Sequence, residues 1–151
     1  MADIEKNIKK IPIASDHAGF DLKQILIPYL EEKGFDVVDM GCYSNESVDY
    51  PDIIHPLAKE INEGNYEFGI IICGTGNGVS MVANKYPNVR CALCWKEEIA
   101  SLAKQHNNAN IIALAARFTP VDIAKKIIDS YLSSSFEGDR HLRRINKIPV
   151  H

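Results

Sequence analysis

Short runs of apolar residues, rich in Ile and Val, alternate along the chain with longer stretches in which apolar and polar positions follow a helical period. This alternation is typical of βαβ units, in which helices join parallel strands, and it predicts an α/β fold with a five-stranded parallel sheet. The predicted strands are 10–14, 36–40, 68–73, 90–95 and 110–114. The predicted helices are 20–33, 53–63, 79–85, 97–106 and 120–133. Because 70–72 is continuously apolar, the third strand is predicted to be central.

Several residues indicate where helices start and stop. Thr119 is predicted to cap the last helix, with Pro120 at its first position. Gly34 is predicted to end the first helix in a left-handed conformation. Pro28 lies inside that helix and removes a backbone donor, which predicts a kink or an early break. After residue 133 the composition is basic and poor in core residues, so 134–144 is predicted to be a helix or arm on a surface.

The composition is that of an ordinary globular protein. The chain has 151 residues, 46 % hydrophobic and 25 % charged, which predicts one domain over 1–151. The net charge is −3 and no run of Lys and Arg exceeds two residues, so no binding to nucleic acid or to a membrane surface is expected. Residues 1–10 lack the apolar stretch of a signal peptide, and no apolar run has the length of a membrane span. A cytoplasmic location and four free thiols are therefore expected.

A glycine-rich turn follows the third predicted strand, at the edge of the sheet where ligands bind in such folds. Its residues are Cys73, Gly74, Thr75, Gly76, Asn77 and Gly78. Without Cβ atoms at three alternate positions, backbone N–H groups can point together at one anionic oxygen. The alternative is a tight turn without a ligand. Neither a dinucleotide fingerprint nor a Walker loop fits, because Val79 stands where the first motif requires Gly and where the second, after Gly78, requires Lys.

Cys73 has two interpretations. It is either a buried thiol at the end of a strand or a general base, because helix-start dipoles or a cation favour the thiolate. A thiolate there could remove a proton from a carbon beside a carbonyl while the turn holds the enediolate oxygen, as in aldose–ketose isomerisation. Cys91 and Cys94 are three apart on a predicted strand, so they are predicted to be packing thiols and not a zinc or redox pair. Cys42 is expected to be structural or incidental.

The polar residues at two other junctions also have structural and functional interpretations. Asp16 caps the following helix or binds sugar hydroxyls, and His17 beside it reaches an anionic group. His106 complements the negative end of a helix dipole or transfers protons near neutral pH. Asn107 offers a donor and an acceptor to a hydroxyl.

Three arginines could hold an anion. Arg140 and Arg144 are four apart, hence on one face of a predicted helix, where they are either a solvated basic face or a clamp for one phosphate. Arg117 follows the fifth predicted strand, at the ligand-binding edge of the sheet.

Six motifs occur in order along the chain: Ser15-Asp16-His17-Ala18-Gly19, Asp49-Tyr50-Pro51, Cys73-Gly74-Thr75-Gly76-Asn77-Gly78, Ala83-Asn84-Lys85, Gln105-His106-Asn107 and Arg140-His141. Together they closely resemble type B ribose-5-phosphate isomerase, over about residues 11–144. The resemblance implies an enzyme without metal or cofactor that interconverts ribose 5-phosphate and ribulose 5-phosphate. It also implies a Rossmann-like three-layer αβα sandwich, and a homodimer, sometimes assembled further into a tetramer.

The resemblance implies catalytic roles for four residues. Cys73 is the base that moves a proton between C2 and C1, while the turn 74–78 holds the enediolate and Thr75 lies near the reacting oxygens. His106, aided by Asp16, helps to open the furanose ring. Some family members carry a glutamate base at the position of Val79, so this chain resembles the cysteine branch.

The resemblance implies further substrate-binding residues, namely His17, Tyr50, Asn107, Arg117, Arg140 and Arg144. His17 and the three arginines bind the phosphate, Asn107 binds sugar hydroxyls and Tyr50 lines the pocket. Each active site lies between two subunits, and the partner is expected to supply His106, Asn107 and Arg117. The segment from about residue 134 is expected to contribute to the dimer and to the phosphate site.

Three alternatives remain open at this point. Related enzymes isomerise six-carbon sugar phosphates such as galactose 6-phosphate or allose 6-phosphate. A non-catalytic sugar-phosphate or nucleotide-binding module would use the same glycine turn but would give Cys73 no task. A cysteine-dependent redox or hydrolytic enzyme would require a covalent adduct on Cys73.

Overall fold

A computed structural model describes residues 9–150 of the chain. The expectations for the first eight residues and for His151 lie outside the described residues. Five strands make one sheet: β1 (Lys10–Ser15), β2 (Asp36–Asp39), β3 (Gly69–Cys73), β4 (Cys91–Leu93) and β5 (Ile111–Ala115). All strand pairs are parallel and the order is β2-β1-β3-β5-β4, so β3 is central as predicted.

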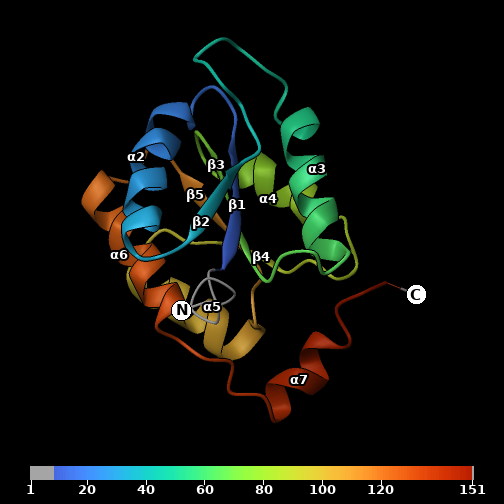
Figure 1. Cartoon of the computed structure of the whole chain (residues 1–151). Helices are drawn as coiled ribbons and strands as arrows, with labels where there is room; N and C mark the ends of the chain where they lie inside the picture. Colours follow the sequence, from blue (N-terminus) through green and yellow to red (C-terminus); the bar gives the residue numbers. More distant parts are fainter. Residues whose placement is uncertain (1–8, 151) are drawn as a thin grey trace, which may run out of the picture.

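Six labelled helices accompany the sheet: α2 (Phe20–Glu32), α3 (Tyr50–Asn62), α4 (Asn77–Ala83), α5 (Glu97–Asn107), α6 (Val121–Leu132) and α7 (Arg140–Ile145). Buried side chains of α2, α5 and α6 pack on one face of the sheet, and those of α3 and α4 pack on the other (Figure 1). The predicted three-layer α/β sandwich is therefore confirmed. None of the helices in residues 9–150 is long and apolar enough to cross a membrane.

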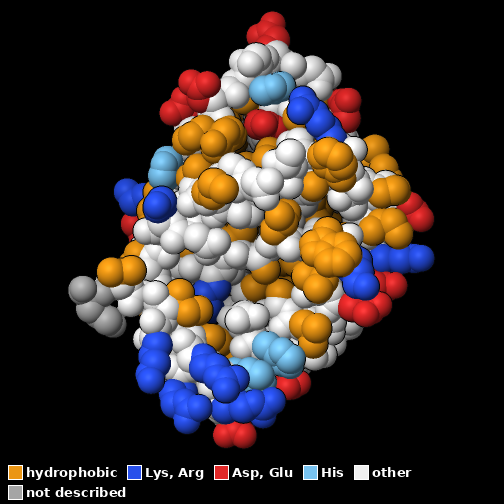
Figure 2. All heavy atoms as spheres, turned by 180° about the vertical axis from the view of Figure 1, so that it is seen from behind, with side chains coloured by type: hydrophobic (Ala, Val, Ile, Leu, Met, Phe, Trp, Pro, Cys, Tyr) orange, Lys and Arg blue, Asp and Glu red, His pale blue; other side chains and the backbone are white. Residues whose placement is uncertain are grey.

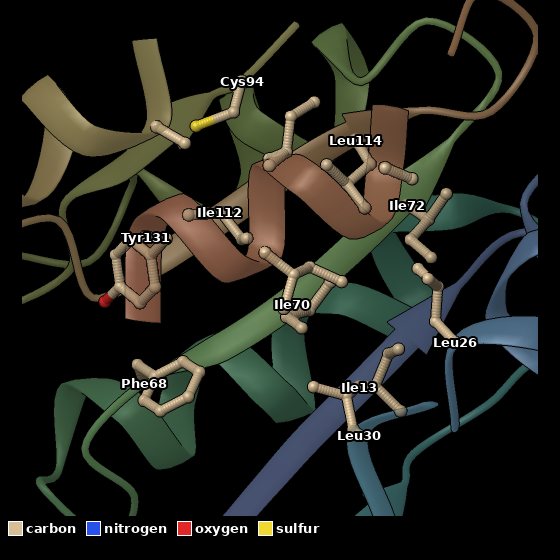
Figure 3. Close-up of a cluster of buried hydrophobic side chains, with 14 of the residues drawn as sticks. Ile13, Leu26, Leu30, Phe68, Ile70, Ile72, Cys94, Ile112, Leu114 and Tyr131 are labelled. Atoms are coloured by element: carbon tan, nitrogen blue, oxygen red, sulfur yellow. The ribbon is translucent and has the colours of Figure 1, made fainter. Parts of the chain in front are cut away.

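The strands alternate their side chains between the two faces, and both faces are covered. On β3, Ile70 and Ile72 lie in the core beneath α2 and α6, while Ile71 lies in the core beneath α3 and α4. Figure 3 shows the first of these cores, in which Leu26 and Leu30 of α2 approach the isoleucines of the sheet. A sheet apolar on both faces keeps its register, because a slip of one residue would exchange the two sets of side chains.

Two helix boundaries differ from the sequence-based predictions. The helix α2 continues through Pro28 to Glu32, so the predicted early break is wrong. Pro28 is exposed, and solvent can satisfy the carbonyl group left without a partner on that side of the helix. Thr119 is buried and makes no capping hydrogen bond, and Pro120 is itself the residue before α6. Gly34 has φ +95°, which confirms the left-handed end of α2.

Two further helices begin earlier than predicted. The helix α3 begins at Tyr50 and not at residue 53, because Pro51 occupies its first turn with φ already suited to a helix. The helix α4 begins at Asn77 and not at residue 79, directly after the left-handed Gly76. These extensions matter because they bring Tyr50 and the glycine turn to the same edge of the sheet.

A fully buried cation links α2 to the loop that leads toward α3. The ammonium group of Lys23 pairs with the Asp39 carboxylate and donates to the carbonyl oxygen of Cys42, at 2.6 Å. Its side chain has no exposed surface, whereas the Asp39 side chain is 28 % exposed. The Gly41 N–H also donates to Asp39, at 3.0 Å, so the carboxylate joins the end of β2 to both partners.

Removing this cation is expected to destabilise the fold strongly. The Lys23→Ala variant leaves the Asp39 carboxylate and the Cys42 carbonyl without their partner, and we expect the free energy of unfolding to fall by about 3–5 kcal/mol in urea titrations. The control is Lys9→Ala, which removes an exposed pair with Glu67 and should cost less than about 1 kcal/mol. Equal losses in the two variants would contradict this assignment.

Candidate active site

The candidate active site lies where the strands end, at a position set by the order of the sheet. From β1 the chain moves to β2 on one side and then returns past β1 to β3 on the other. The connections after β1 and β3 therefore diverge to opposite faces, toward α2 and α4, and leave a crevice between them. A cavity of about 320 Å³ lies there, lined by Asp16, His17, Ala18, Tyr50, Cys73, Gly74, Thr75, Gly78 and Arg117.

The glycine turn has a backbone that only glycine adopts without strain at its centre. Gly76 has φ +75°, and a Cβ atom there would collide with the Leu93 side chain. The Gly76 N–H donates to the Cys73 sulfur at 3.1 Å, and the Asn77 N–H donates to the Thr75 hydroxyl oxygen at 3.3 Å. Two of the N–H groups expected to face a ligand are thus bonded to side chains of the turn itself.

The side chain of Cys73 lines the cavity at the end of β3. The residue ends β3, is only 5 % exposed and lines the cavity with its neighbours Gly74 and Thr75. A donor aimed at the sulfur and the beginning of a helix beside it are the surroundings in which thiols react as anions. Cys73 also packs in the core beneath α3 and α4, so its surroundings allow both a packing thiol and a general base.

The other cysteines lie away from this cavity. Cys94 packs in the core beneath α5 and α6, whereas Cys91 packs against the core on the opposite face, so the predicted divergence of the two sulfurs is confirmed. Burial raises the pKa of both thiols to about 12. Cys42 is buried and its thiol donates to the Ser44 carbonyl at 3.3 Å, which is a structural contact.

Asp16 and His17 are held firmly in the connection after β1. The Asp16 carboxylate accepts hydrogen bonds from the N–H groups of Ala18 and Gly19, at 2.9 and 3.1 Å, so it braces the turn before α2. His17 Nδ1 accepts from the Val48 N–H at 3.2 Å. The proton of the neutral imidazole is therefore on Nε2, which remains a donor for an anionic ligand.

Tyr50 and Arg117 both line the cavity, and each lies against a glycine of the turn. A Cβ atom at Gly78 would come within 2.6 Å of the Tyr50 ring, and one at Gly74 would come within 3.1 Å of the Arg117 guanidinium. The Arg117 backbone N–H also donates to the Gly74 carbonyl at 3.1 Å. Arg117 thus shares a cavity with Cys73 of its own chain and does not lie with His106 and Asn107.

A second group of predicted site residues lies at the opposite end of the sheet. His106 and Asn107 end α5, just before β5 begins. The segment before α7 joins them, since the Glu137 N–H donates to the Gln105 carbonyl at 3.0 Å. Figure 1 shows α7 at the bottom of the view, far from the carboxyl ends of the strands. Because a five-residue strand spans about 16 Å, these residues do not reach Cys73 within one chain.

The second group contains two residues that sequence reasoning did not assign a role. The imidazole ring of His106 stacks on that of His141, with centroids 4.4 Å apart and planes 12° apart. The Glu137 carboxylate lies 3.7 Å from Nε2 of each ring. His141 appeared only within the Arg140-His141 motif, and its spacing of four from Glu137 was the available signal.

This trio is poorly arranged for a metal ion. Its ligand atoms lie within 4.8 Å of one another, and each residue type binds transition metals. A metal bonded to imidazole lies in the plane of the ring, however, and two nearly parallel rings do not direct their lone pairs to one point. His141 also feels the positive charges of Arg140 and Arg144, which oppose a dication.

Figure 2 shows histidine and basic side chains near the upper and the lower ends of one face of the molecule, with hydrophobic side chains between them. Large apolar side chains that are exposed in the single chain include Met81, Trp95, Leu102, Phe118, Leu142 and Ile148. An anionic ligand could therefore be held at either end of this face.

Comparison with known proteins identifies close relatives by sequence. A family model described as "Ribose/Galactose Isomerase" matches residues 11–148. Ribose-5-phosphate isomerase B of Escherichia coli is 39 % identical over 141 residues, which cover 93 % of this chain and 95 % of that protein. The probable ribose-5-phosphate isomerase B of Mycoplasma genitalium is 46 % identical over 138 residues, covering 90 % and 91 %.

Solved structures are similar over the same length. A ribose 5-phosphate isomerase from Thermotoga maritima matches with a TM-score of 0.91 and 49 % identity, covering 93 % of this chain and 97 % of that one. Ribose-5-phosphate isomerase B from Mycoplasma genitalium with bound ribulose-5-phosphate matches with a TM-score of 0.88 and 46 % identity, covering 92 % and 93 %.

The thiols are expected to differ in reactivity. At pH 8, iodoacetamide should alkylate Cys73 at least about tenfold faster than Cys91 and Cys94, because thiols with a pKa near 12 form almost no thiolate at that pH. Mass spectrometry of tryptic peptides measures the three rates. In urea all cysteines should react alike, and alkylation of Cys91 in the folded protein at the rate of Cys73 would contradict the prediction.

Proposed function

The chain belongs to the ribose/galactose isomerase family, and on this premise we propose that it is an aldose–ketose isomerase that interconverts ribose 5-phosphate and ribulose 5-phosphate. The observation that carries the proposal is the Cys73 sulfur at the floor of a small cavity walled by His17 and Arg117. The relative from Mycoplasma genitalium, with its bound ribulose-5-phosphate, supports the choice of substrate.

Cys73 is the proposed base. Its thiolate takes the proton from C2 of the open-chain aldose, and the electron pair of the broken C–H bond forms the C1–C2 double bond of an enediolate. The negative charge moves to the oxygen on C1, and Thr75 and the free N–H groups of the turn are proposed to donate hydrogen bonds to it. The reaction ends when the oxygen on C1 receives the hydroxyl proton of C2 and the thiol returns its proton to C1.

Ring opening comes before this step, because ribose 5-phosphate is mostly a furanose. His106 is proposed to protonate the ring oxygen while Asp16 accepts the hydrogen bond of a sugar hydroxyl. Asn107 is proposed to bind a further hydroxyl, with one donor and one acceptor. Tyr50 closes the cavity on the side of α3.

The phosphate is proposed to bind between basic groups of two chains. His17 and Arg117 line the cavity of one chain, and Arg140 and Arg144 extend from α7 of a second. Charge-assisted hydrogen bonds from guanidinium groups to phosphate are strong and directional, so the phosphate fixes the sugar over Cys73.

The separation of the two groups within one chain is the argument for a homodimer. A two-fold axis through the apolar middle of the face in Figure 2 would bring the lower end of one copy against the upper end of the other. Each of two identical sites would then combine Cys73 of one chain with His106 of its partner. The segment from about residue 134, which carries α7, would lie at this interface, and assembly to a tetramer would leave the sites unchanged.

We also propose a single domain over the whole chain and a cytoplasmic location. One sheet with a core on each face accounts for all strands among residues 9–150. The cysteines are all free, which suits a reducing compartment, and phosphorylated sugars are made and used inside cells.

The activity and the base are tested together. The protein should convert ribose 5-phosphate to ribulose 5-phosphate faster than it converts allose 6-phosphate or galactose 6-phosphate, and in heavy water deuterium should appear at C1 of the product. Cys73→Ser should lower kcat by about 10²- to 10⁴-fold while the circular dichroism spectrum is unchanged, because a hydroxyl is a far weaker acid than a thiol.

The matched control is Cys91→Ser, which also removes a thiol but lies outside the cavity and should keep kcat within about twofold. Faster turnover of a six-carbon sugar phosphate would contradict the proposed substrate but not the proposed role of Cys73 as the base. Binding of ribose 5-phosphate without turnover would favour a sugar-phosphate-binding module, and a covalent adduct on Cys73 during turnover would favour the redox or hydrolytic alternative.

Shared sites predict complementation between inactive chains. When Cys73→Ala and His106→Ala proteins are mixed and allowed to exchange subunits, half of the dimers carry one intact site, so about a quarter of the normal activity per chain should return. Native mass spectrometry of chains with different tags verifies the exchange. No recovery after verified exchange would contradict a site shared between chains.

A further inference from the structure

Two residues beside His106 have no task in the proposed reaction, although their contacts are specific. His141 is only 8 % exposed, and its Nε2 is buried without a hydrogen-bond partner. Its ring lies face to face with that of His106, which fixes the plane of the His106 imidazole. A buried polar atom without a partner is costly, so its retention calls for an explanation.

Glu137, in the segment before α7, is the third member of the cluster with His106 and His141. Its backbone N–H is bonded to the carbonyl of Gln105, next to His106, which tethers the carboxylate to the end of α5. One carboxylate oxygen lies 3.7 Å from Nε2 of His106 and 3.7 Å from Nε2 of His141. At this distance it attracts a protonated imidazole without forming a short hydrogen bond.

The surroundings of His141 disfavour a positive charge on its ring. Burial lowers the pKa of His141, and the charges of His106, Arg140 and Arg144 lower it further, whereas Glu137 raises it. His141 is therefore neutral near pH 7. The charged groups that face the stack are Glu137 from the segment before α7 and the two arginines from α7. Of the two rings, that of His106 is the more exposed, at 41 % against 9 % for His141.

We propose that Glu137 and His141 are positioning residues for His106: the His141 ring holds the imidazole in one plane, and the Glu137 carboxylate stabilises its protonated form. This inference rests on the proposed role of His106 in ring opening. An acid that protonates the ring oxygen of the sugar must carry a proton and point it at that oxygen. The Glu137 carboxylate favours the proton, and the stacked His141 ring fixes the direction.

The inference separates ring opening from proton transfer between the carbons. Ribulose 5-phosphate has its fifth oxygen esterified and stays an open chain, so exchange of its C1 hydrogen with solvent requires the base but no ring opening. Conversion of ribose 5-phosphate requires both. A residue that serves His106 alone should therefore affect conversion and leave the exchange intact.

The experiment uses the full-length protein and five variants, one of which is His106→Ala. Glu137→Gln removes the carboxylate charge at constant shape, and Glu98→Gln is its control, since Glu98 is an exposed carboxylate in the first turn of the same helix as His106. His141→Ala removes the stacked ring, and His141→Phe keeps a ring without the buried nitrogen. Because Phe restores the packing, the pair remains informative if the Ala variant folds poorly.

Glu137→Gln and His141→Ala should each lower kcat for ribose 5-phosphate by about three- to tenfold, with KM changed less than about twofold because the phosphate groups are untouched. The C1 exchange of ribulose 5-phosphate should stay within about twofold of normal. His141→Phe should recover most of kcat, and Glu98→Gln should match the unmodified protein.

The outcomes separate the two proposals. If His106→Ala has normal kcat, the role of His106 in the proposed function fails. If His106→Ala is impaired while Glu137→Gln and His141→Ala have normal kcat, the positioning role alone is overturned. Equal losses of conversion and exchange in Glu137→Gln would also overturn it. If added Zn²⁺ inhibits the unmodified protein but not the Glu137→Gln variant, the cluster binds a cation, and the positioning role is overturned.

Discussion

The hydrogen bond between the Gly76 N–H and the Cys73 sulfur is the contact on which the site depends, and the fold is what makes it possible. It requires β3 to end at Cys73 and the chain to turn at once through the left-handed Gly76. A residue with a side chain at this point would meet Leu93. The chemistry of the cavity therefore begins with a backbone conformation that one residue type can adopt.

The sheet that builds this cavity also limits what one chain can do. Its strands are covered on both faces, so they are rigid and hold the two edges apart by the length of a strand. Cys73 lies at one edge, and His106 with α7 lies at the other. In the proposed homodimer, opposite edges of two chains would meet, and a single symmetric interface would complete two sites at once.

The proposed role of His106 as an acid requires its side chain to hold one orientation. His106 belongs to the end of a helix, half-exposed in the single chain, and would sample several orientations if nothing packed on it. The ring of His141, with a nitrogen left unpaired in the interior, replaces that freedom by one plane. The missing hydrogen bond of the His141 nitrogen is thus tolerated because the His141 ring orients that of His106.

The sequence alone determined the features that depend on local chemistry. The alternation of apolar runs predicted all five strands and the parallel sheet, and the spacing of Cys91 and Cys94 predicted that they face different cores. Gly34 ended α2 as expected, because a left-handed residue is a property of the backbone at that position. Cys73, Asp16 and His17 were found because they directly follow apolar runs.

Tertiary structure decided what depends on residues far apart in the chain. It placed Arg117 beside Gly74 and not with His106, because β5 pairs with β3 and carries Arg117 to the same edge. It kept α2 intact at Pro28, where the missing donor faces solvent, and it brought Glu137 and His141 to His106 through the docking of α7 on α5. No local pattern encodes such contacts, since they arise only when separate elements pack on a common sheet.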